Sequence, residues 1–159
     1  MTLRSAVIRY VAYAVMIVLV GAALLGFLER DGRARADEPA GTVEIDYPKV
    51  TRQGLKPALA VEVVNRDRVA REVSIDLSSE YLEALQLGTV SPDPAESRGV
   101  GDGQVRYTFA AIGTGERLRA LFAFSIDQQS PRLRARTPVR VALGEAALLE
   151  TSLTTTVLP

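Results

Sequence analysis

Cysteine, histidine and tryptophan are all absent from this chain of 159 residues. Without cysteine there is no disulfide bond or thiolate nucleophile, and without histidine there is no imidazole base or histidine ligand for a metal or haem. Aromatic residues make up only 6% of the chain, whereas apolar residues of all kinds make up 47%. These values predict one packed domain with a mainly aliphatic core.

An excess of charge of either sign is also missing, because 19 Lys and Arg residues face 19 Asp and Glu residues. Nucleic-acid-binding domains usually carry a clear basic excess, so no nucleic-acid partner is expected. We also predict no metal, no cofactor and no small-molecule substrate, because no binding motif for one is present.

The N-terminal region contains the strongest pattern, an uncharged run of 19 residues from Tyr10 to Leu28, YVAYAVMIVLVGAALLGFL. As a helix this run is ~28 Å long, close to the ~30 Å hydrocarbon core of a bilayer. We therefore predict a transmembrane helix over residues 10–28, retained as a signal-anchor. A signal peptide cleaved after Ala36 is the alternative, although an apolar region of ~7–15 residues is usual there.

The predicted topology is that of a single-pass protein. Residues 1–9 form a short cytoplasmic N-terminus, because a short segment before a signal-anchor usually stays inside. Residues 29–41, charged and small with Gly and Pro, predict a flexible stalk. The main domain is then extracytoplasmic, in the periplasm or at the cell surface.

Alternation of apolar and polar residues dominates residues 42–159 and predicts strands. A short helical segment near residues 78–85, starting at a serine cap, is the exception. The fold class expected is all-β, an immunoglobulin-like antiparallel β-sandwich of about seven strands. The alternation assigns these residues to the core: Val61, Val63, Val73, Ile75, Val105, Tyr107, Phe109, Phe122, Phe124, Val139 and Val141.

The stretch LAVEVVNRDRVAREVSIDLS, residues 59–78, resembles bacterial surface modules of the NEW3 and CARDB type. In those modules a strand ends in V-x-N, a short polar turn follows, and the next strand reads V-x-V or V-x-I. Such modules are usually adaptors or spacers, so the resemblance implies binding or structural work. It implies no catalytic residue.

Catalysis would have to depend on a pair of carboxylates, since histidine and cysteine are absent and the two lysines lie in no serine motif. We predict that the protein is not an enzyme, and keep a small carboxylate-dependent hydrolase as an alternative. The acids that could serve it are Asp76, Glu80, Glu83, Asp93, Glu96 and Asp102.

Arginines gather near the C-terminus, where residues 128–143 contain four of them and no acid. Their alternation places them on one face of a strand, and Pro138 predicts that this strand lies at a sheet edge. Three compensating partners stay open: the acidic segment 74–102 of the same chain, an anionic membrane surface, or an acidic surface of another protein. The candidate docking residues are Arg132, Arg134, Arg136 and Arg140.

These patterns together predict a membrane-anchored accessory module whose β-sandwich docks onto an integral membrane or envelope protein. A sandwich that binds a ligand or an envelope polymer is the second alternative, beside the hydrolase.

Overall fold

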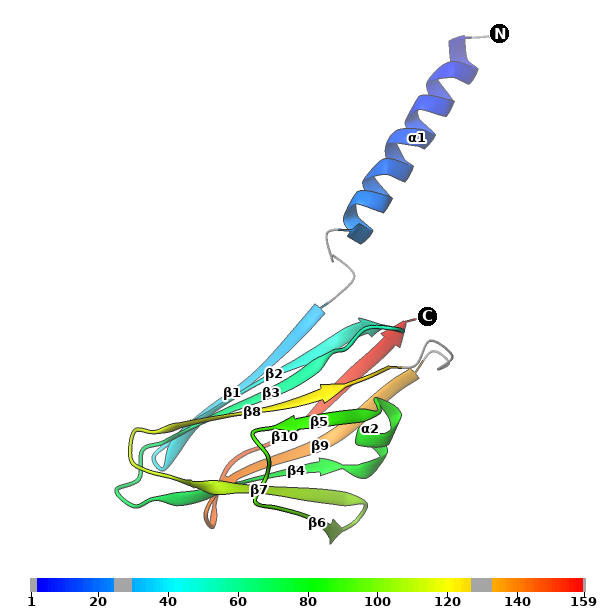
Figure 1. Ribbon diagram of the computed structural model, residues 1–159. Helices are drawn as coiled ribbons and strands as arrows, with labels where there is room; N and C mark the ends of the chain where they lie inside the picture. The colour runs from blue at the N-terminus through cyan, green and yellow to red at the C-terminus, as the bar shows by residue number, and fades with distance from the viewer. Residues whose placement is uncertain (1–2, 25–29, 127–132, 159) are drawn as a thin grey trace.

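The computed structural model describes residues 3–24, 30–126 and 133–158, which form one helix followed by a β domain (Figure 1). Helix α1 (Leu3–Leu24) covers most of the predicted span, while residues 25–28 of that span lie outside the described part. Within the described residues, no helix is both long and apolar enough to cross a membrane.

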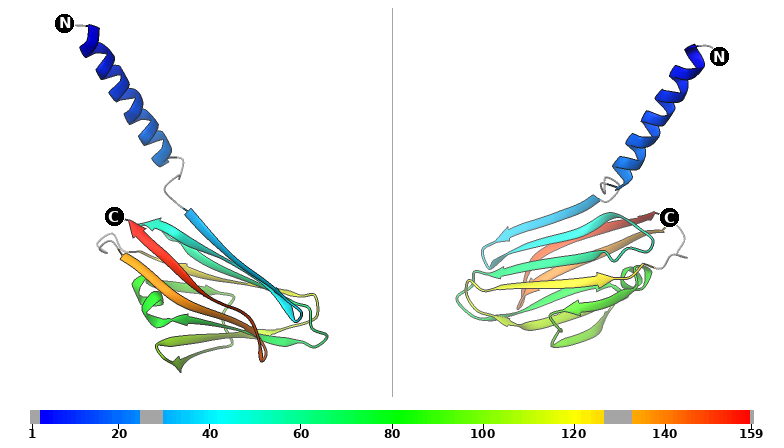
Figure 2. Two further views of the ribbon diagram at one scale, coloured as in Figure 1. Left: turned by 180° about the vertical axis from the view of Figure 1, so that it is seen from behind. Right: turned by 45° about the horizontal axis from the view of Figure 1, so that its top comes forward.

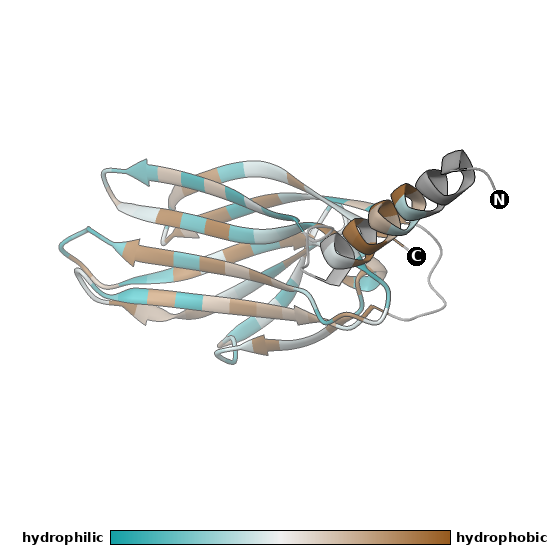
Figure 3. Ribbon diagram, turned by 90° about the horizontal axis from the view of Figure 1, so that it is seen from above, coloured by the Kyte–Doolittle hydropathy of each residue, from teal (hydrophilic) through white to brown (hydrophobic). Residues whose placement is uncertain are grey.

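The described part of the β domain contains ten strands, whereas the sequence predicted about seven. They form two layers that are linked by one strand pair (Figures 2 and 3). The first sheet has the strand order β5 (Leu87–Ser91), β8 (Arg117–Phe124), β3 (Ala58–Asn65), β2 (Gly41–Arg52) and β1 (Arg30–Glu38). The second has the order β10 (Ala146–Leu158), β9 (Leu133–Leu143), β4 (Arg71–Ser78), β7 (Gln104–Ile112) and β6 (Glu96–Gly101).

The link between the sheets is the end of β2. Its residues Val50–Arg52 pair in parallel with Thr156–Leu158 of β10, whereas the other strand pairs are antiparallel. The first part of β2 pairs with β3 and β1 instead. One long strand therefore joins both layers, and the fold is a β-sandwich as predicted.

The core between the sheets is built from the alternating apolar residues, visible as brown bands along the strands in Figure 3. Phe122 of β8 and Tyr107 of β7 meet across the two layers, edge to face, with ring centroids 5.2 Å apart. The predicted core residues are buried, with the exception of Val105, which is half-buried near the start of β7. Parity along the strands thus predicted the core well.

The predicted flexible stalk over residues 29–41 is corrected, because Arg30–Glu38 forms strand β1 on the edge of the first sheet. Its inward positions are the small residues Ala34 and Ala36, which pack against the core. Its outward Arg33 pairs with Glu44 and Asp46 of β2. Small inward residues and charged outward ones gave no apolar periodicity, yet they suit a charged edge strand.

The domain consequently begins by residue 30 and not at residue 42. Gly32 shows how closely β1 packs on its neighbour: a Cβ there would lie 2.4 Å from Cζ of Tyr47 and 2.7 Å from Cε of Lys49. Only glycine leaves room for these two side chains over the strand.

The edge position predicted for the arginine-bearing strand is also corrected, because β9 lies between β10 and β4. Pro138 is tolerated there because the β4 ladder stops at Asp76, opposite Arg140. Beyond that point the N–H of Ser78 donates to Oγ1 of Thr137, 2.9 Å away. The proline therefore falls where no backbone donor toward β4 is needed.

Helix α2 (Ser79–Ala84) lies beside the first half of β9, close to the predicted short helical segment. Ser78 is its N-cap residue but makes no side-chain cap hydrogen bond, so the predicted serine cap is present only in position. Tyr81 of α2 is fully buried against Phe124, with ring centroids 5.8 Å apart. The helix closes one end of the sandwich core.

Candidate docking surface on the second sheet

The outward face of β9 carries the arginines singled out by the sequence. Arg134, Arg136 and Arg140 are exposed, and they alternate with buried residues of the core. Arg132 lies outside the described residues. The predicted common face of the other three is therefore present, but their surroundings divide β9 into two halves.

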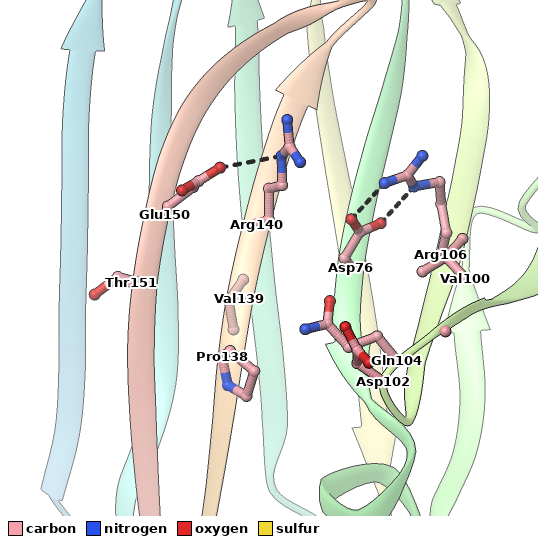
Figure 4. A pocket seen from close by; sticks show the side chains of 11 residues that line it. Asp76, Val100, Asp102, Gln104, Arg106, Pro138, Val139, Arg140, Glu150 and Thr151 are labelled. Atoms are coloured by element: carbon pink, nitrogen blue, oxygen red, sulfur yellow. Dashed lines mark hydrogen bonds and ion pairs between the residues drawn. The ribbon is translucent and has the colours of Figure 1, made fainter.

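Arg140, in the second half of β9, belongs to a transverse row of charges across the sheet. In the strand register Glu150 of β10 stands opposite Arg140, Arg140 opposite Asp76 of β4, and Asp76 opposite Arg106 of β7. Nε of Arg140 lies 3.2 Å from Oε1 of Glu150, as Figure 4 shows. Opposite charges at directly facing positions stabilise neighbouring strands.

Asp76 is the buried member of this row. Nε of Arg106 donates to its Oδ1 and Nη2 of Arg106 donates to its Oδ2, each over 2.7 Å (Figure 4). The side chain of Asp76 is 5% exposed and that of Arg106 is 30% exposed. The hydrogen bond to Asp76 raises the pKa of Arg106, while burial acts in the opposite direction. A two-pronged pair of this kind is rigid and strong.

A groove of about 350 Å³ lies over this row, and the turn of the β6–β7 hairpin forms one of its walls. Asp102 at that turn has a φ of 49° between two glycines that also have positive φ. The groove has a mixed lining of charged, amide, hydroxyl and apolar groups (Figure 4). It is lined by Asp76, Val100, Gly101, Asp102, Gln104, Arg106, Pro138, Val139, Arg140, Glu150 and Thr151.

Arg134 and Arg136, in the first half of β9, have other neighbours. On one side they face Thr156 and Thr154 of β10, and on the other side α2 takes the place of β4. Nε of Arg136 donates to Oγ of Ser152 over 2.7 Å. Among the residues that the structure describes, neither arginine forms an ion pair.

The acidic segment 74–102, one of the compensating partners left open by the sequence, does not supply the ion-pair partner of Arg140. Its ion pair is with Glu150, which lies outside that segment, while Asp76 is held by Arg106. Glu80 of α2 lines a small cavity of about 50 Å³ together with Arg134 and Arg136, but makes no ion pair with them. The partner of Arg140 was missed because alternation describes one strand at a time, whereas Glu150 reaches Arg140 through the register of the β9–β10 hairpin.

The acids considered for catalysis are spread over several elements. Asp76 and Asp102 share the groove, yet both oxygens of Asp76 are engaged by Arg106. Glu80 and Glu83 lie on α2, Asp93 in the β5–β6 connection and Glu96 at the start of β6. Within the described ranges no group of three or more acidic side chains could hold a metal ion.

Asn65, the asparagine of the V-x-N signature, is fully buried, and its side chain is used in the fold. Its Nδ2 donates to the carbonyls of Val69 and Ile112, and its Oδ1 accepts from the N–H of Asp67. It thereby ties the β3–β4 turn to the end of β7. The signature that suggested a family resemblance thus has a structural role here.

No family model matches this chain, and no curated protein matches it. Solved structures do resemble it. A cohesin module of a family 33 glycoside hydrolase from Clostridium perfringens is 16% identical, with 76% of this chain and 98% of that chain covered and a TM-score of 0.52.

Two further structures are more distant. A non-cellulosomal cohesin from Archaeoglobus fulgidus is 14% identical over 69% of this chain and 86% of its own, with a TM-score of 0.43. A CARDB domain from Pyrococcus furiosus, solved with di-metal ions, is 13% identical over 80% and 95%, with a TM-score of 0.43. At 16% identity the likeness to the Clostridium perfringens cohesin module is one of fold alone, that of a β-sandwich.

Proposed function

We propose that this protein is a membrane-anchored interaction module whose second sheet binds an acidic surface of another membrane or envelope protein. The observation that carries the proposal is the pair Arg134 and Arg136, exposed side by side on a regular sheet without an acidic partner among the described residues. Residues two apart on a strand lie ~6.6 Å from each other, so two like charges repel unless something compensates them.

The neighbours of this pair suit a binding surface. Ser152, Thr154 and Thr156 of β10 add a row of hydroxyl groups beside the two guanidinium groups. Arginine pairs with carboxylates through two parallel hydrogen bonds, and it is enriched where proteins bind one another. A patch of arginine and hydroxyl donors therefore fits a partner rich in Asp and Glu.

The Arg140 end of β9 stabilises the sheet and offers no unpaired charge to a partner. Glu150 and the Asp76–Arg106 pair neutralise that end within the chain. We accordingly assign docking to Arg134 and Arg136, and give Arg140 a role in sheet pairing.

Anchoring of the module is part of the proposal and rests on the N-terminal segment. Its run of 19 uncharged residues has the length of a membrane span. Large apolar side chains of α1, among them Met16, Ile17 and Val18, are more than 60% exposed, so no part of the described domain covers them. Exposed apolar surface of this size needs a lipid or protein environment. We place the N-terminus in the cytoplasm and the β domain outside the cell membrane.

The test is purification of the full chain in mild detergent, comparing the parent with R134E/R136E. We expect a co-purifying protein that is lost with the charge reversal. The unfolding temperature should change little, because neither arginine forms an ion pair among the described residues and the hydrogen bond from Arg136 to Ser152 is exposed. R35E/R119E, at two exposed arginines of the first sheet that form no ion pair within the described part of the chain, is the matched control and should keep the partner.

Two results would overturn the assignment. A loss of folding stability in R134E/R136E without loss of the partner would mean that the arginines pair within the chain. A partner lost equally in the control would mean that overall charge, and not this face of β9, governs binding.

A further inference from the structure

Four basic residues gather at the end of the β domain where the chain enters it. Arg30 is the first residue of β1. Lys49 and Arg52 lie at the C-terminal end of β2, and Lys56 lies in the loop from β2 to β3. The register explains their proximity, because antiparallel pairing sets Arg30 opposite Val50. Both views of Figure 2 show the start of β1 and the end of β10 at this same end. We call these four residues the basic collar.

The four residues of the basic collar form no ion pair among the described residues. Arg30, Lys49 and Lys56 are exposed, and Arg52 is half-exposed. Among the described residues, Asp31 is the acidic neighbour at this end, and it lines a groove with Lys56. The collar includes both lysines of the chain. It therefore carries a surplus of positive charge in a protein without net charge.

The opposite end of the domain provides the contrast. There Arg66 pairs with Asp37, and Arg71 pairs with Asp67. At the far end Arg66 and Arg71 are neutralised by acids of the chain, and Arg68 is exposed without an ion pair among the described residues. At the near end none of the four collar cations is neutralised in this way by a described residue. The composition of the whole chain does not account for this difference.

The loop between β2 and β3 holds an apolar residue next to the collar in a fixed position. Leu55 is 37% exposed and directly precedes Lys56. Backbone hydrogen bonds join Gln53 to Leu158, Gly54 to Ile126 and Ile126 to Leu55, so the loop is tied to the ends of β10 and β8. A leucine presented among cations is a combination that suits the boundary between headgroups and acyl chains.

The chain itself limits the distance of the collar from α1. Only five residues separate Leu24 from Arg30. Fully extended, six residue steps span ~20 Å. If α1 is the membrane anchor of the proposed function, the basic collar belongs to the part of the domain that lies nearest the bilayer.

We infer that the basic collar binds the anionic headgroups of the membrane in which the protein is anchored, with Leu55 entering the headgroup layer. This inference rests on the anchoring in the proposed function. Basic groups within a Debye length of an anionic leaflet are attracted to it, and high salt screens the attraction. Such contact would restrict the tilt of the domain relative to the membrane.

The experiment uses the full chain in nanodiscs of phosphatidylcholine, with or without phosphatidylglycerol, and measures amide hydrogen exchange over residues 50–58. We expect exchange there to slow about tenfold with phosphatidylglycerol, and the effect to vanish near ~1 M salt. R30Q/R52Q/K56Q removes three charges of the collar and should reduce the effect to less than about twofold. Lys49 is kept because its chain packs over Gly32.

R35Q/R68Q/R119Q is the matched control, since it removes three exposed arginines away from the collar and should behave as the parent. Equal exchange in both kinds of disc, with the chain bound to the discs, would overturn the inferred binding of the collar to anionic headgroups and leave the proposed anchoring intact. A chain that does not co-migrate with discs would instead overturn the proposed anchoring. Slowing that survives in R30Q/R52Q/K56Q but is lost in R134Q/R136Q would assign the lipid contact to β9.

Discussion

Both halves of strand β9 carry arginines at the same parity, but only the arginine of the second half forms an ion pair among the described residues. Arg140 stands between β10 and β4 and finds Glu150 across the strand pair. Arg134 and Arg136 stand between β10 and α2, opposite Thr156 and Thr154. The comparison teaches that parity directs a side chain outward, whereas the neighbouring strand decides whether its charge is free.

The boundary between the halves is the end of the β4 ladder. Thr137 there accepts a hydrogen bond from Ser78 and donates one to the carbonyl of Pro138. Beneath the first half, Thr155 of β10 donates to the carbonyl of Pro48, 2.7 Å away, so Tyr81 must donate its own O–H to Thr155. Each half is thus held by a polar contact of its own, which substitutions can remove separately.

The largest effect is expected from the paired half, on replacing Asp76 with alanine. Arg106 would lose its partner for two hydrogen bonds in a mostly buried position. We expect the free energy of unfolding to fall by about 2–3 kcal/mol, below the cost for a fully buried pair because Arg106 is partly exposed. Chemical denaturation measures it, with the exposed Asp93→Ala as control. An equal, small change in both variants would contradict the structural weight given to this pair.

The next effect concerns the first half, where Thr155→Val removes the acceptor of the Tyr81 hydroxyl. Valine has nearly the same shape, but the hydroxyl of Tyr81 and the carbonyl of Pro48 would be left unsatisfied. We expect a loss of about 1–3 kcal/mol in the free energy of unfolding. Thr154→Val, on the exposed side of the same strand, should change it little. A larger loss in the free energy of unfolding for Thr154→Val than for Thr155→Val would show that the Tyr81 contact does not stabilise this half.

Alkaline pH offers a second test of the first half. Burial raises the pKa of Tyr81 to about 12. An unfolded tyrosine ionises near pH ~10, so between about pH 10 and 12 unfolding releases a proton and stability falls as pH rises. Tyr81→Phe should weaken this dependence of the unfolding midpoint on pH. A slope identical to that of the parent would mean that Tyr81 does not contribute.

The smallest effect is expected for Glu150→Gln, which removes the ion-pair partner of Arg140. The pair is more than 45% exposed on both sides, so its loss should cost less than about 1 kcal/mol. We expect Arg140 then to become a free cation like Arg134. Stability is measured by thermal unfolding, and partner binding by the same purification as for R134E/R136E. Stronger binding of the acidic partner would support the role given to free arginines.

The sequence by itself determined the class of fold, the alternation of the core and the side of β9 on which the arginines lie. These properties depend on local periodicity, because a strand turns successive side chains to opposite faces. The candidate docking face could therefore be predicted from Arg134, Arg136 and Arg140 alone.

Only the tertiary structure decided which of these arginines is neutralised, that Arg30–Glu38 is a strand, and that β9 lies inside its sheet. Each of these depends on which strand lies alongside and in which register it pairs. Glu150 reaches Arg140 through the β9–β10 register, and Arg33 of β1 finds its acids on β2. Pro138 is tolerated because the β4 ladder has already ended. Alternation is a property of one strand, whereas pairing and register arise between strands, and for that reason they appear only when the chain is folded.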